Sequence, residues 1–446
     1  MGKIMVASST MTIFILLVIV TITIPRTEAG IGEFDDFLKN QSQEAHKLVL
    51  DSYVPIPEEI ADDLNVHVNL LMQQRNNTRR ELAQKGKRKR GPCEATNPID
   101  SCWRCQQNWA QNRFQLAKCG KGFGRRATGG LGGRIYVVTD PSDNDMVNPK
   151  VGTLRHAVIQ KGPLWIIFQR SMIIRLNQEL MVTSDKTIDG RGANVQVKDG
   201  AGITMQFVNN VIIHGLRMTN IRSKNGGMIR DSVDHVGIRT KSDGDAISIF
   251  GSSNIWIDHL SLSQCEDGLV DVIQGSTGVT ISNCHMTKHN DVMLFGASDT
   301  YNGDKMMQVT VAFNHFGQGL IQRMPRCRFG FVHVLNNDYT HWQMYAIGGS
   351  AGPTILSQGN RFIAPFNTAA KEVTHRDYAA KGVWQNWQWT SEMDVFMNGA
   401  TFTPSGSPIN KSPLKKAFMM KPRHGSQASR LTRHSGALNC MVGRPC

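Results

Sequence analysis

Short apolar runs with alternating β-branched residues recur along the chain from about residue 128 onward. Each run begins with a polar or turn-forming residue, and successive runs begin about 20–30 residues apart. Alternation with a period of two in such short runs predicts β-strands rather than helices. The predicted strand segments are 210–213, 235–238, 254–257, 278–281, 308–311, 330–334 and 353–356.

One strong strand per repeat, with no helix-length segment between successive strands, indicates a solenoid. The missing helices exclude a βαβ fold, and propeller blades would need about 40 residues or more per repeat. The pattern therefore predicts an all-β fold, a parallel β-helix whose coils bury apolar positions against the coils above and below. Asparagines that follow the strands can stack between coils and satisfy buried backbone groups: Asn283, Asn314, Asn336 and Asn360.

The first 91 residues differ from the rest of the chain in their pattern of apolar, polar and charged residues. Residues 1–29 combine Lys3, an apolar run at 11–24 and small residues before a cleavage position, which predicts a secretory signal peptide. That run is shorter than the ~20 residues of a membrane span. Residues 30–91 show helical apolar spacing in two segments and end in the basic run 85–90, so we expect a small helical extension with a basic linker. Residues 92–446 would form the β-helix domain, with its core at about 128–405.

Charge and cysteine content fit a secreted protein that meets a polyanion. The net charge is +14 at pH 7, and a basic surface attracts an acidic polymer. Secretion favours an extracellular polysaccharide over nucleic acid. Nine cysteines in an oxidising compartment predict disulfides, with Cys93, Cys102, Cys105 and Cys119 in one cluster and at least one thiol left over. Glycosylation sequons begin at Asn40, Asn76 and Asn410.

Acidic residues gather at two positions about one coil apart. Asp243-Gly-Asp245 precedes one strand, and Asp267-Gly-Leu-Val-Asp271, next to Glu266, follows. In a solenoid, residues one period apart become neighbours, so these aspartates can meet on one face. Carboxylates gathered without basic partners repel one another, and a hard divalent ion such as Ca²⁺ takes oxygen ligands and relieves that repulsion. The alternative is that the Asp-Gly pairs are ordinary turn residues.

The densest basic cluster of the core is Gln322-Arg-Met-Pro-Arg-Cys-Arg328. Arg323, Arg326 and Arg328 can each bind carboxylates with paired donors, or they can form a structural ladder with nearby aspartates. His259 and His289 are candidates for acid–base work or for packed positions in the repeat. The sequence contains no Gly-x-Ser-x-Gly elbow, no His-Glu-x-x-His and no phosphate-binding loop.

Several longer motifs carry a resemblance to a known family. They include Asn97-Pro-Ile-Asp-Ser-Cys-Trp-Arg-Cys105, Lys186-Thr-Ile-Asp-Gly-Arg-Gly192, Ile255-Trp-Ile-Asp-His259 and Gln322-Arg-Met-Pro-Arg326. With them the chain resembles the plant pectate lyases of the parallel β-helix polysaccharide lyase family, over about residues 92–405. Residues 30–91 are similar, more weakly, to the N-terminal segment of some plant members. The resemblance implies a right-handed, pectin lyase-like β-helix and calcium-dependent, eliminative cleavage of (1→4)-α-D-galacturonan to 4,5-unsaturated oligogalacturonides in the plant cell wall.

The resemblance also implies roles for matching residues. The calcium ligands would be Asp243, Asp267 and Asp271, with Asp245 and Glu266 nearby. Arg323 would be the Brønsted base, and Arg328, with Arg326, would bind substrate carboxylate. Asp258 and His259 would brace the site from beneath. The chain departs from the family at Asp291, where many members carry a substrate-binding lysine, and Lys288 is the nearest substitute.

The implied reaction is a β-elimination in which a base removes the C5 hydrogen of a metal-bound uronate and O4 departs. Because guanidinium groups keep their proton to about pH 12 or above, Arg323 as base implies an alkaline optimum. Alternatively, hydroxide is the base and Arg323 stabilises the enolate. Two other functions stay open: a polygalacturonase-type hydrolase with a carboxylate acid and base, and a catalytically weak, allergen-like pectin-binding wall protein. We expect a monomer that binds acidic polysaccharide, with no nucleic acid and no membrane partner.

Overall fold

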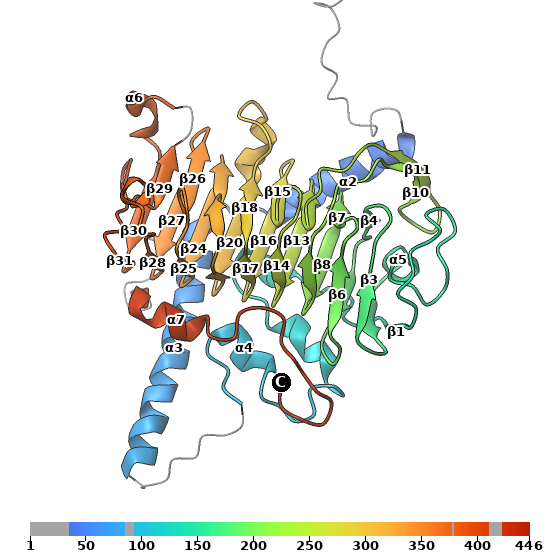
Figure 1. The fold of residues 1–446 in the computed structure, drawn as a ribbon, viewed down its shortest axis with the longest axis horizontal. Helices are drawn as coiled ribbons and strands as arrows, with labels where there is room; N and C mark the ends of the chain where they lie inside the picture. Colours follow the sequence, from blue (N-terminus) through green and yellow to red (C-terminus); the bar gives the residue numbers. More distant parts are fainter. Residues whose placement is uncertain (1–34, 85–92, 377–378, 410–421) are drawn as a thin grey trace, which may run out of the picture.

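The computed structural model describes residues 35–84, 93–376, 379–409 and 422–446. Most of the chain coils into a solenoid of three parallel sheets (Figure 1), which we call sheets A, B and C in the order in which each coil visits them. This arrangement confirms the predicted parallel β-helix. The predicted signal peptide, the basic run 85–90 and the sequon at Asn410 lie outside the described residues.

Sheet A contains, in spatial order, β1 (Arg134–Val138), β2 (Leu164–Phe168), β5 (Lys186–Asp189), β8 (Asn209–His214), β13 (Ser253–Asp258), β16 (Thr277–Ser282), β20 (Gln308–Ala312), β24 (Phe331–Leu335), β27 (Thr354–Gln358) and β30 (Trp389–Glu392). Sheet B contains β3 (Met172–Ile174), β6 (Val195–Lys198), β9 (Arg217–Thr219), β14 (Ser261–Ser263), β17 (His285–Thr287), β21 (His315–Phe316), β25 (Asp338–Thr340), β28 (Arg361–Ile363) and β31 (Val395–Met397). Sheet C runs through β4 (Leu180–Met181), β7 (Ile203–Gln206), β12 (Ile247–Phe250), β15 (Val270–Ile273), β19 (Leu294–Phe295), β23 (Arg326–Arg328), β26 (Ile347–Ser350) and β29 (Thr374–Arg376).

Alternation along the strands of sheet A explains why the coils stack. Every second residue of a strand points its side chain inward, and these positions are apolar. Parallel pairing places equivalent positions above one another. One such column, fully buried, consists of Ile255, Val279, Val309, Val332 and Ile355. Burying each aliphatic side chain contributes about 1.5–3 kcal/mol, so the repeated pattern stabilises the stacking of coils. Six of the seven predicted strand segments lie in sheet A.

The seventh prediction, a coil strand at 235–238, was wrong. These residues belong to β11 (Val236–Arg239), which pairs antiparallel with β10 (Gly227–Arg230). The two strands form a separate two-stranded sheet, inserted in the connection between β9 and β12. A period of two is the same in a hairpin and in a coil strand, so the local pattern could not separate the two structures.

An asparagine ladder runs along the turn from sheet A to sheet B, and it includes two of the four predicted members, Asn314 and Asn360, but neither Asn283 nor Asn336. Asn314 Nδ2 donates to Asn337 Oδ1 at 3.0 Å, and Asn337 Nδ2 donates to Asn360 Oδ1 at 3.0 Å. Asp394 ends the ladder by accepting from the backbone N–H of Asn360 at 2.6 Å. Asn336 instead occupies the preceding column, where the backbone has positive φ. That column includes Asn283 (φ 52°), Asn336 (φ 50°) and Gly359 (φ 61°).

The N-terminal segment forms two helices, α2 (Asp36–Ser52) and α3 (Pro57–Gln84), which confirms the predicted helical spacing. Both helices pack against the solenoid. Leu64 and Val68 of α3 are fully buried, and Asn65 Nδ2 donates to Gln358 Oε1 of sheet A at 2.8 Å. Gln308 exchanges two hydrogen bonds with the backbone of Val54, between the helices. No helix within the described ranges is long and apolar enough to cross a membrane.

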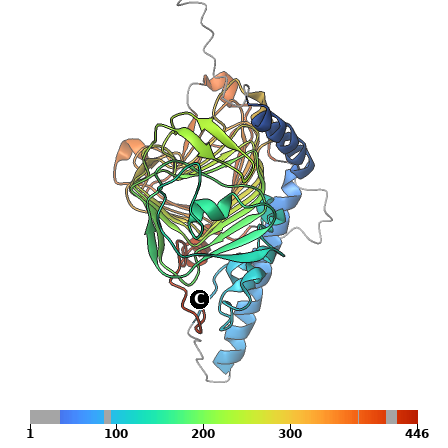
Figure 2. The same cartoon turned by 90° about the vertical axis from the view of Figure 1, so that its right-hand side faces the viewer.

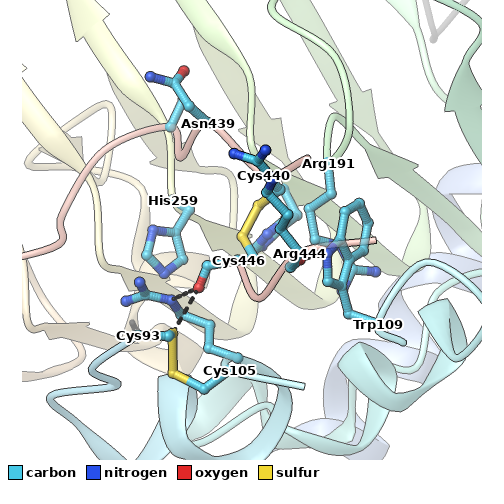
Figure 3. The surroundings of a disulfide bond; sticks show 12 residues. Cys93, Cys105, Trp109, Arg191, His259, Asn439, Cys440, Arg444 and Cys446 are labelled. Carbon is cyan, nitrogen blue, oxygen red and sulfur yellow. Dashed lines mark hydrogen bonds between the residues drawn. A yellow bond between two sulfur atoms is a disulfide. The ribbon is translucent and has the colours of Figure 1, made fainter. Parts of the chain in front are cut away.

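Disulfides brace the segment before the first coil and, separately, the C-terminal tail. Cys93–Cys105 and Cys102–Cys119 form the predicted cluster, and Cys440–Cys446 closes the C-terminal tail. The tail returns to this cluster (Figure 3), where the carbonyl oxygen of Cys446 accepts a hydrogen bond from Arg104 Nε at 3.2 Å and lies 3.1 Å from Cys93 Sγ. Three thiols are free: Cys265, Cys284 and Cys327.

The N-terminal end of the solenoid is closed by the short helix α5 (Leu154–Val158), which lies across the opening (Figure 2). Its apolar residues, Leu154, Ala157 and Val158, are buried in the main core. Arg155 forms a buried two-pronged ion pair with Asp143 at 2.6 and 2.8 Å. Helix α5 therefore covers the apolar interior that the first coil would otherwise expose. The other short helices are α4 (Pro98–Trp103), η2 (Arg113–Lys118), η3 (Phe123–Arg126), η4 (Asn302–Met306), η5 (Thr368–Ala370), α6 (Lys381–Trp384), η7 (Gly425–Gln427) and α7 (Ala428–Leu431).

Candidate active site

The predicted acidic residues converge on the edge of sheet C where its strands begin. Asp243 and Asp245 lie on the loop before β12, Asp267 lies on the loop before β15, and Asp271 lies on β15 itself. Because β12 and β15 pair in parallel, with Ser248 opposite Asp271, the two loops are stacked. The Gly268 N–H donates to Asp245 Oδ1 at 2.7 Å across this step. The period of the solenoid thus brings the acidic side chains together, as the sequence predicted.

Three of these carboxylates have raised pKa values. Burial raises the pKa of Asp245 well above its usual range, and the charges of Asp271, Asp267 and Asp243 add to the effect. Burial, then the charge of Asp267, does the same for Asp271. The pKa of Asp267 is raised by burial and by Asp243 and Asp291. The cluster is therefore a set of acids that resist carrying their full negative charge together.

The chemistry of this donor set fits a hard divalent cation. Asp245 and Asp271 each give one oxygen to a backbone N–H, from Gly268 at 2.7 Å and Leu294 at 3.1 Å, which leaves the second oxygen of each carboxylate for another ligand. All of these donors are oxygens, the ligands that Ca²⁺ takes. As they stand, no three His, Cys, Asp or Glu side chains within the described ranges are arranged to hold a metal ion. The carboxylates are thus adjacent, but they are not closed into a coordination sphere.

Glu266, predicted to lie near the cluster, is committed to a different partner. Its two carboxylate oxygens accept from the backbone N–H and the hydroxyl of Ser223 at 2.9 and 2.8 Å. These hydrogen bonds lower the pKa of Glu266, in contrast to the raised values of its neighbours. Glu266 therefore anchors the loop, because both of its carboxylate oxygens are bound to Ser223.

Arg323 lies beside the cluster, with its side chain about a quarter exposed. It follows β22 (Leu320–Gln322), which pairs in parallel with β18 (His289–Asp291). Arg323 Nε lies 3.0 Å from Asp291 Oδ1 as an ion pair, without the alignment of a hydrogen bond. Gln322 Nε2 donates to the same Asp291 oxygen at 3.0 Å. The residue at the family's usual lysine position is thus a direct partner of the predicted base.

The other predicted substrate-binding residues are spread along this edge. Arg326 is buried on β23. Arg328, on the same strand, donates from Nε to Asp299 Oδ1 at 2.7 Å and from a terminal nitrogen to the carbonyl of Gly296 at 2.6 Å. Lys288 is exposed at the turn between β17 and β18, three residues before Asp291. Asp299 could not be predicted as this partner, because a lone acid in a loop carries no signal of a partner 29 residues away.

Two predicted histidines take different positions. His259 is fully buried, with Nε2 at 2.7 Å from Asp100 Oδ1 and Nδ1 at 2.9 Å from the Gly436 carbonyl. It belongs to the turn after sheet A and ties α4 to the C-terminal tail (Figure 3), so the expectation that it braces the site from beneath was wrong. His289 is buried on β18, and burial lowers its pKa. Its Nε2 has no hydrogen-bond partner among the described residues.

Fold and site together define a class: a parallel β-helix protein with an acidic cluster and neighbouring arginines on one sheet edge. A family model described as "Pectate lyase" matches residues 174–437, and one described as "Pectate lyase, N terminus" matches residues 30–82. The chain is 59% identical over 420 residues to a pectate lyase of Lilium longiflorum, covering 94% of this chain and 96% of the relative. It is 54% identical to probable pectate lyase 7 of Arabidopsis thaliana, covering 95% and 96%. The chain belongs to the pectate lyase family.

Solved structures agree on the fold. The crystal structure of jun a 1, the major allergen from cedar pollen, matches with a TM-score of 0.74 and 48% identity, covering 77% of this chain and 99% of that one. A thermostable pectate lyase matches with a TM-score of 0.51 and 20% identity, covering 71% and 97%. At that identity the second likeness concerns the fold alone.

Proposed function

We propose that this protein is a secreted, calcium-dependent pectate lyase that cleaves (1→4)-α-D-galacturonan by β-elimination and releases 4,5-unsaturated oligogalacturonides in the plant cell wall. The observation that carries the proposal is the group of mutually repelling aspartates beside Arg323 on one edge of sheet C. Membership of the pectate lyase family supports the reaction class. The net charge of +14 suits an acidic polymer as substrate.

The residues that would hold calcium are Asp243, Asp245, Asp267 and Asp271. A bound calcium ion would supply positive charge that binds the substrate carboxylate and makes the adjacent C5 hydrogen more acidic. The chain's own contribution is the position of its arginines. Arg323 would remove the C5 proton or stabilise the enolate that forms when another base removes it, while Arg326 and Arg328, with Lys288, would bind carboxylates of neighbouring sugar units.

Arg328 must exchange partners for that role, because Asp299 already accepts its Nε–H at 2.7 Å. The side chain of Asp299 is about half exposed, so a substrate carboxylate can replace it at little cost in desolvation. Asp291, in contrast, hinders the binding of a substrate carboxylate, because its negative charge lies beside both Arg323 and Asp267. A uronate entering this space meets repulsion from Asp291 unless a cation neutralises it.

The pair between Asp291 and Arg323 favours a second candidate, a catalytically weak pectin-binding wall protein. In that case the ion pair would keep Arg323 from the substrate. The likeness to the cedar pollen allergen is compatible with this candidate as well. Turnover separates the two functions, because a binding protein would take up polygalacturonate in calcium without forming product.

The test is an assay on polygalacturonate with calcium or with a chelator, following the ultraviolet absorbance of the unsaturated product. The wild-type protein should form product only with calcium, and hydrolysis would form none that absorbs. Asp271→Asn keeps the shape of the side chain and should lower kcat/KM about 100-fold or more, the size of effect seen when a metal ligand or its immediate support is lost. Asp234→Asn removes an exposed carboxylate elsewhere and serves as the control. Equal rates for wild type and Asp271→Asn would remove the cluster from the chemistry.

Arg323→Lys should change the pH–rate profile, and an unchanged rate and profile would exclude Arg323 from the reaction.

A further inference from the structure

A cavity of about 1180 Å³ extends from the acidic cluster along the outer face of sheet C, under helix α2. One wall is α2, which contributes Lys39, Ser42 and His46. The floor and far side come from the ends of β7, β12 and β15 and from β11. Asp243 lines the cavity too, so this space is continuous with the candidate active site. It spans the coils from β7 to the loop after β19, which contributes Ala297 and Tyr301.

Helix α2 is fixed in place at both ends, so the wall is part of the folded protein. At its start, Asp35 Oδ2 lies 3.0 Å from His235 Nε2, and Phe37 stacks on the His235 ring with centroids 4.2 Å apart. At its end, Asn254 Nδ2 of sheet A donates to Ser52 Oγ at 2.8 Å. The helix thus runs from the β10–β11 hairpin toward sheet A (Figure 1), and its residues line one side of the cavity.

Two polar groups in the cavity lack the partners that such groups normally have. Within the described chain, the Arg239 guanidinium reaches one hydrogen-bond acceptor, the weak Sδ of Met181, at 3.2 Å. Burial lowers the pKa of Arg239, and the carboxylates of Glu179 and Asp231 act on it only through space. Gln206 Oε1 is buried, and no donor among the described residues reaches it. An unpaired guanidinium and an unpaired amide oxygen need an acceptor anion and a donor hydroxyl.

The floor of the cavity is an apolar row with the spacing of the strands. Gln206, Phe250 and Ile273 occupy the same register position on β7, β12 and β15, so they lie about 4.8 Å apart from one strand to the next. Phe207 meets Phe250 edge to face, with ring centroids 5.4 Å apart, and Tyr301 lines the same space. Aromatic faces bind the apolar faces of sugar rings while polar groups at the rim bind their substituents.

We propose that this cavity is a further sugar-binding subsite, which takes a uronate unit of the same acidic polysaccharide chain that crosses the active site. Arg239 binds the carboxylate of that unit, Gln206 Oε1 accepts from a hydroxyl, Phe250 contacts the ring, and Lys39 approaches from α2. The inference rests on the proposed function for the identity of the polymer. It assigns helix α2 a function, since the N-terminal extension forms one wall of this groove.

Equilibrium binding of a series of oligogalacturonates, from trimer to octamer, tests the proposal in buffer with a chelator, where the proposed lyase forms no product and the oligomers stay intact. For wild type, affinity should rise with length until the subsite is filled. Arg239→Gln should abolish the last increase of affinity with length. The longest oligomers should then bind about tenfold more weakly, while the affinity for the trimer should change little. Lys39→Gln, on the exposed surface of α2, should act in the same direction by about threefold. Lys47→Gln removes the same charge from the same helix, away from the cavity lining, and should bind like wild type.

Steady-state rates distinguish a remote subsite from a change in the chemistry. On polygalacturonate, Arg239→Gln should raise KM with kcat unchanged. Thermal unfolding at the wild-type midpoint would show that the variant is folded. The proposal is overturned if Arg239→Gln and Lys39→Gln keep the wild-type dependence on length. Binding and product formation are measured separately, so a wild-type protein that binds long oligomers through Arg239 without forming unsaturated product would refute the proposed lyase activity and leave the subsite standing.

Discussion

Asp394 should make the stability of the solenoid depend on pH. It ends the asparagine ladder, and it accepts from the Asn360 N–H at 2.6 Å and from the hydroxyls of Ser357 and Ser391 at 2.7 Å each. Burial raises its pKa from 3.8 to about 6, against the opposing effect of these hydrogen bonds. A carboxyl group whose folded-state pKa is raised contributes stability that is fully present below its unfolded pKa, near 3.8. That contribution is lost as the pH rises through 6.

The size of this pKa shift sets the size of the effect. A rise from 3.8 to about 6 corresponds to at most about 3 kcal/mol between strongly acidic and alkaline conditions, and to about 1.4 kcal/mol between pH 5 and pH 8. Asp394→Asn has the same shape and no charge. Its amide can donate to the two serine hydroxyls, which rotate to accept. The variant should therefore equal wild type near pH 4 and exceed it by up to about 3 kcal/mol at pH 8.

Denaturant unfolding at several pH values, compared between wild type and Asp394→Asn, measures this difference. Subtracting the two curves removes the contributions of all other titrating groups. Asp234→Asn, which removes an exposed carboxylate paired with Lys161, should leave the pH dependence of stability unchanged. If Asp394→Asn and wild type ran in parallel from pH 4 to pH 8, the carboxyl group would not be protonated in the folded state and the reasoning would fail.

Three further changes have defined outcomes. Replacing Cys102 and Cys119 by serine opens a loop with a sequence separation of 17 and should cost about 3 kcal/mol of unfolding free energy; a loss below about 1 kcal/mol would contradict this. Leu64→Ala, at a fully buried position of α3, should weaken the packing of α3 on the solenoid by about 2–5 kcal/mol and speed proteolysis of residues 57–84. Leu70→Ala, at an exposed position of the same helix, should not, and equal proteolysis rates for the two variants would contradict the prediction. Asp291→Asn should lower KM for polygalacturonate about threefold or more by removing like-charge repulsion, and an unchanged KM would show that the substrate does not meet this charge.

The strands of the solenoid were predictable because each coil repeats the same inward alternation, as at 254–257 and 278–281. The same period is ambiguous where it serves a hairpin, and 235–238 was misassigned for that reason. The ladder position was missed by one residue because two asparagines stand side by side. Asn336 has a positive φ, which asparagine tolerates well, while Asn337 makes the stacking hydrogen bonds. Composition alone cannot tell which of two adjacent asparagines has which role.

The acidic part of the site was predictable because its members lie one coil apart, as with Asp245 and Asp267. The ion pairs of Arg323 and Arg328 were not predictable, because their partners, Asp291 and Asp299, are 32 and 29 residues earlier and no local pattern shows that they meet. Nor could helical spacing in 36–52 show which side of the solenoid the helix covers. Amphipathic periodicity predicts that a helix packs by one face, but it does not identify the surface against which that face packs.

Helix α5 also hinders the end-to-end stacking of one solenoid on another molecule. A solenoid ends in an unpaired strand and an open apolar mouth, and each can accept a coil from another molecule. By filling that mouth with Leu154, Ala157 and Val158, α5 removes the apolar interior as a surface on which a second copy could stack at this end. A protein built from repeats that pair so readily is thereby hindered from growing end to end into fibres.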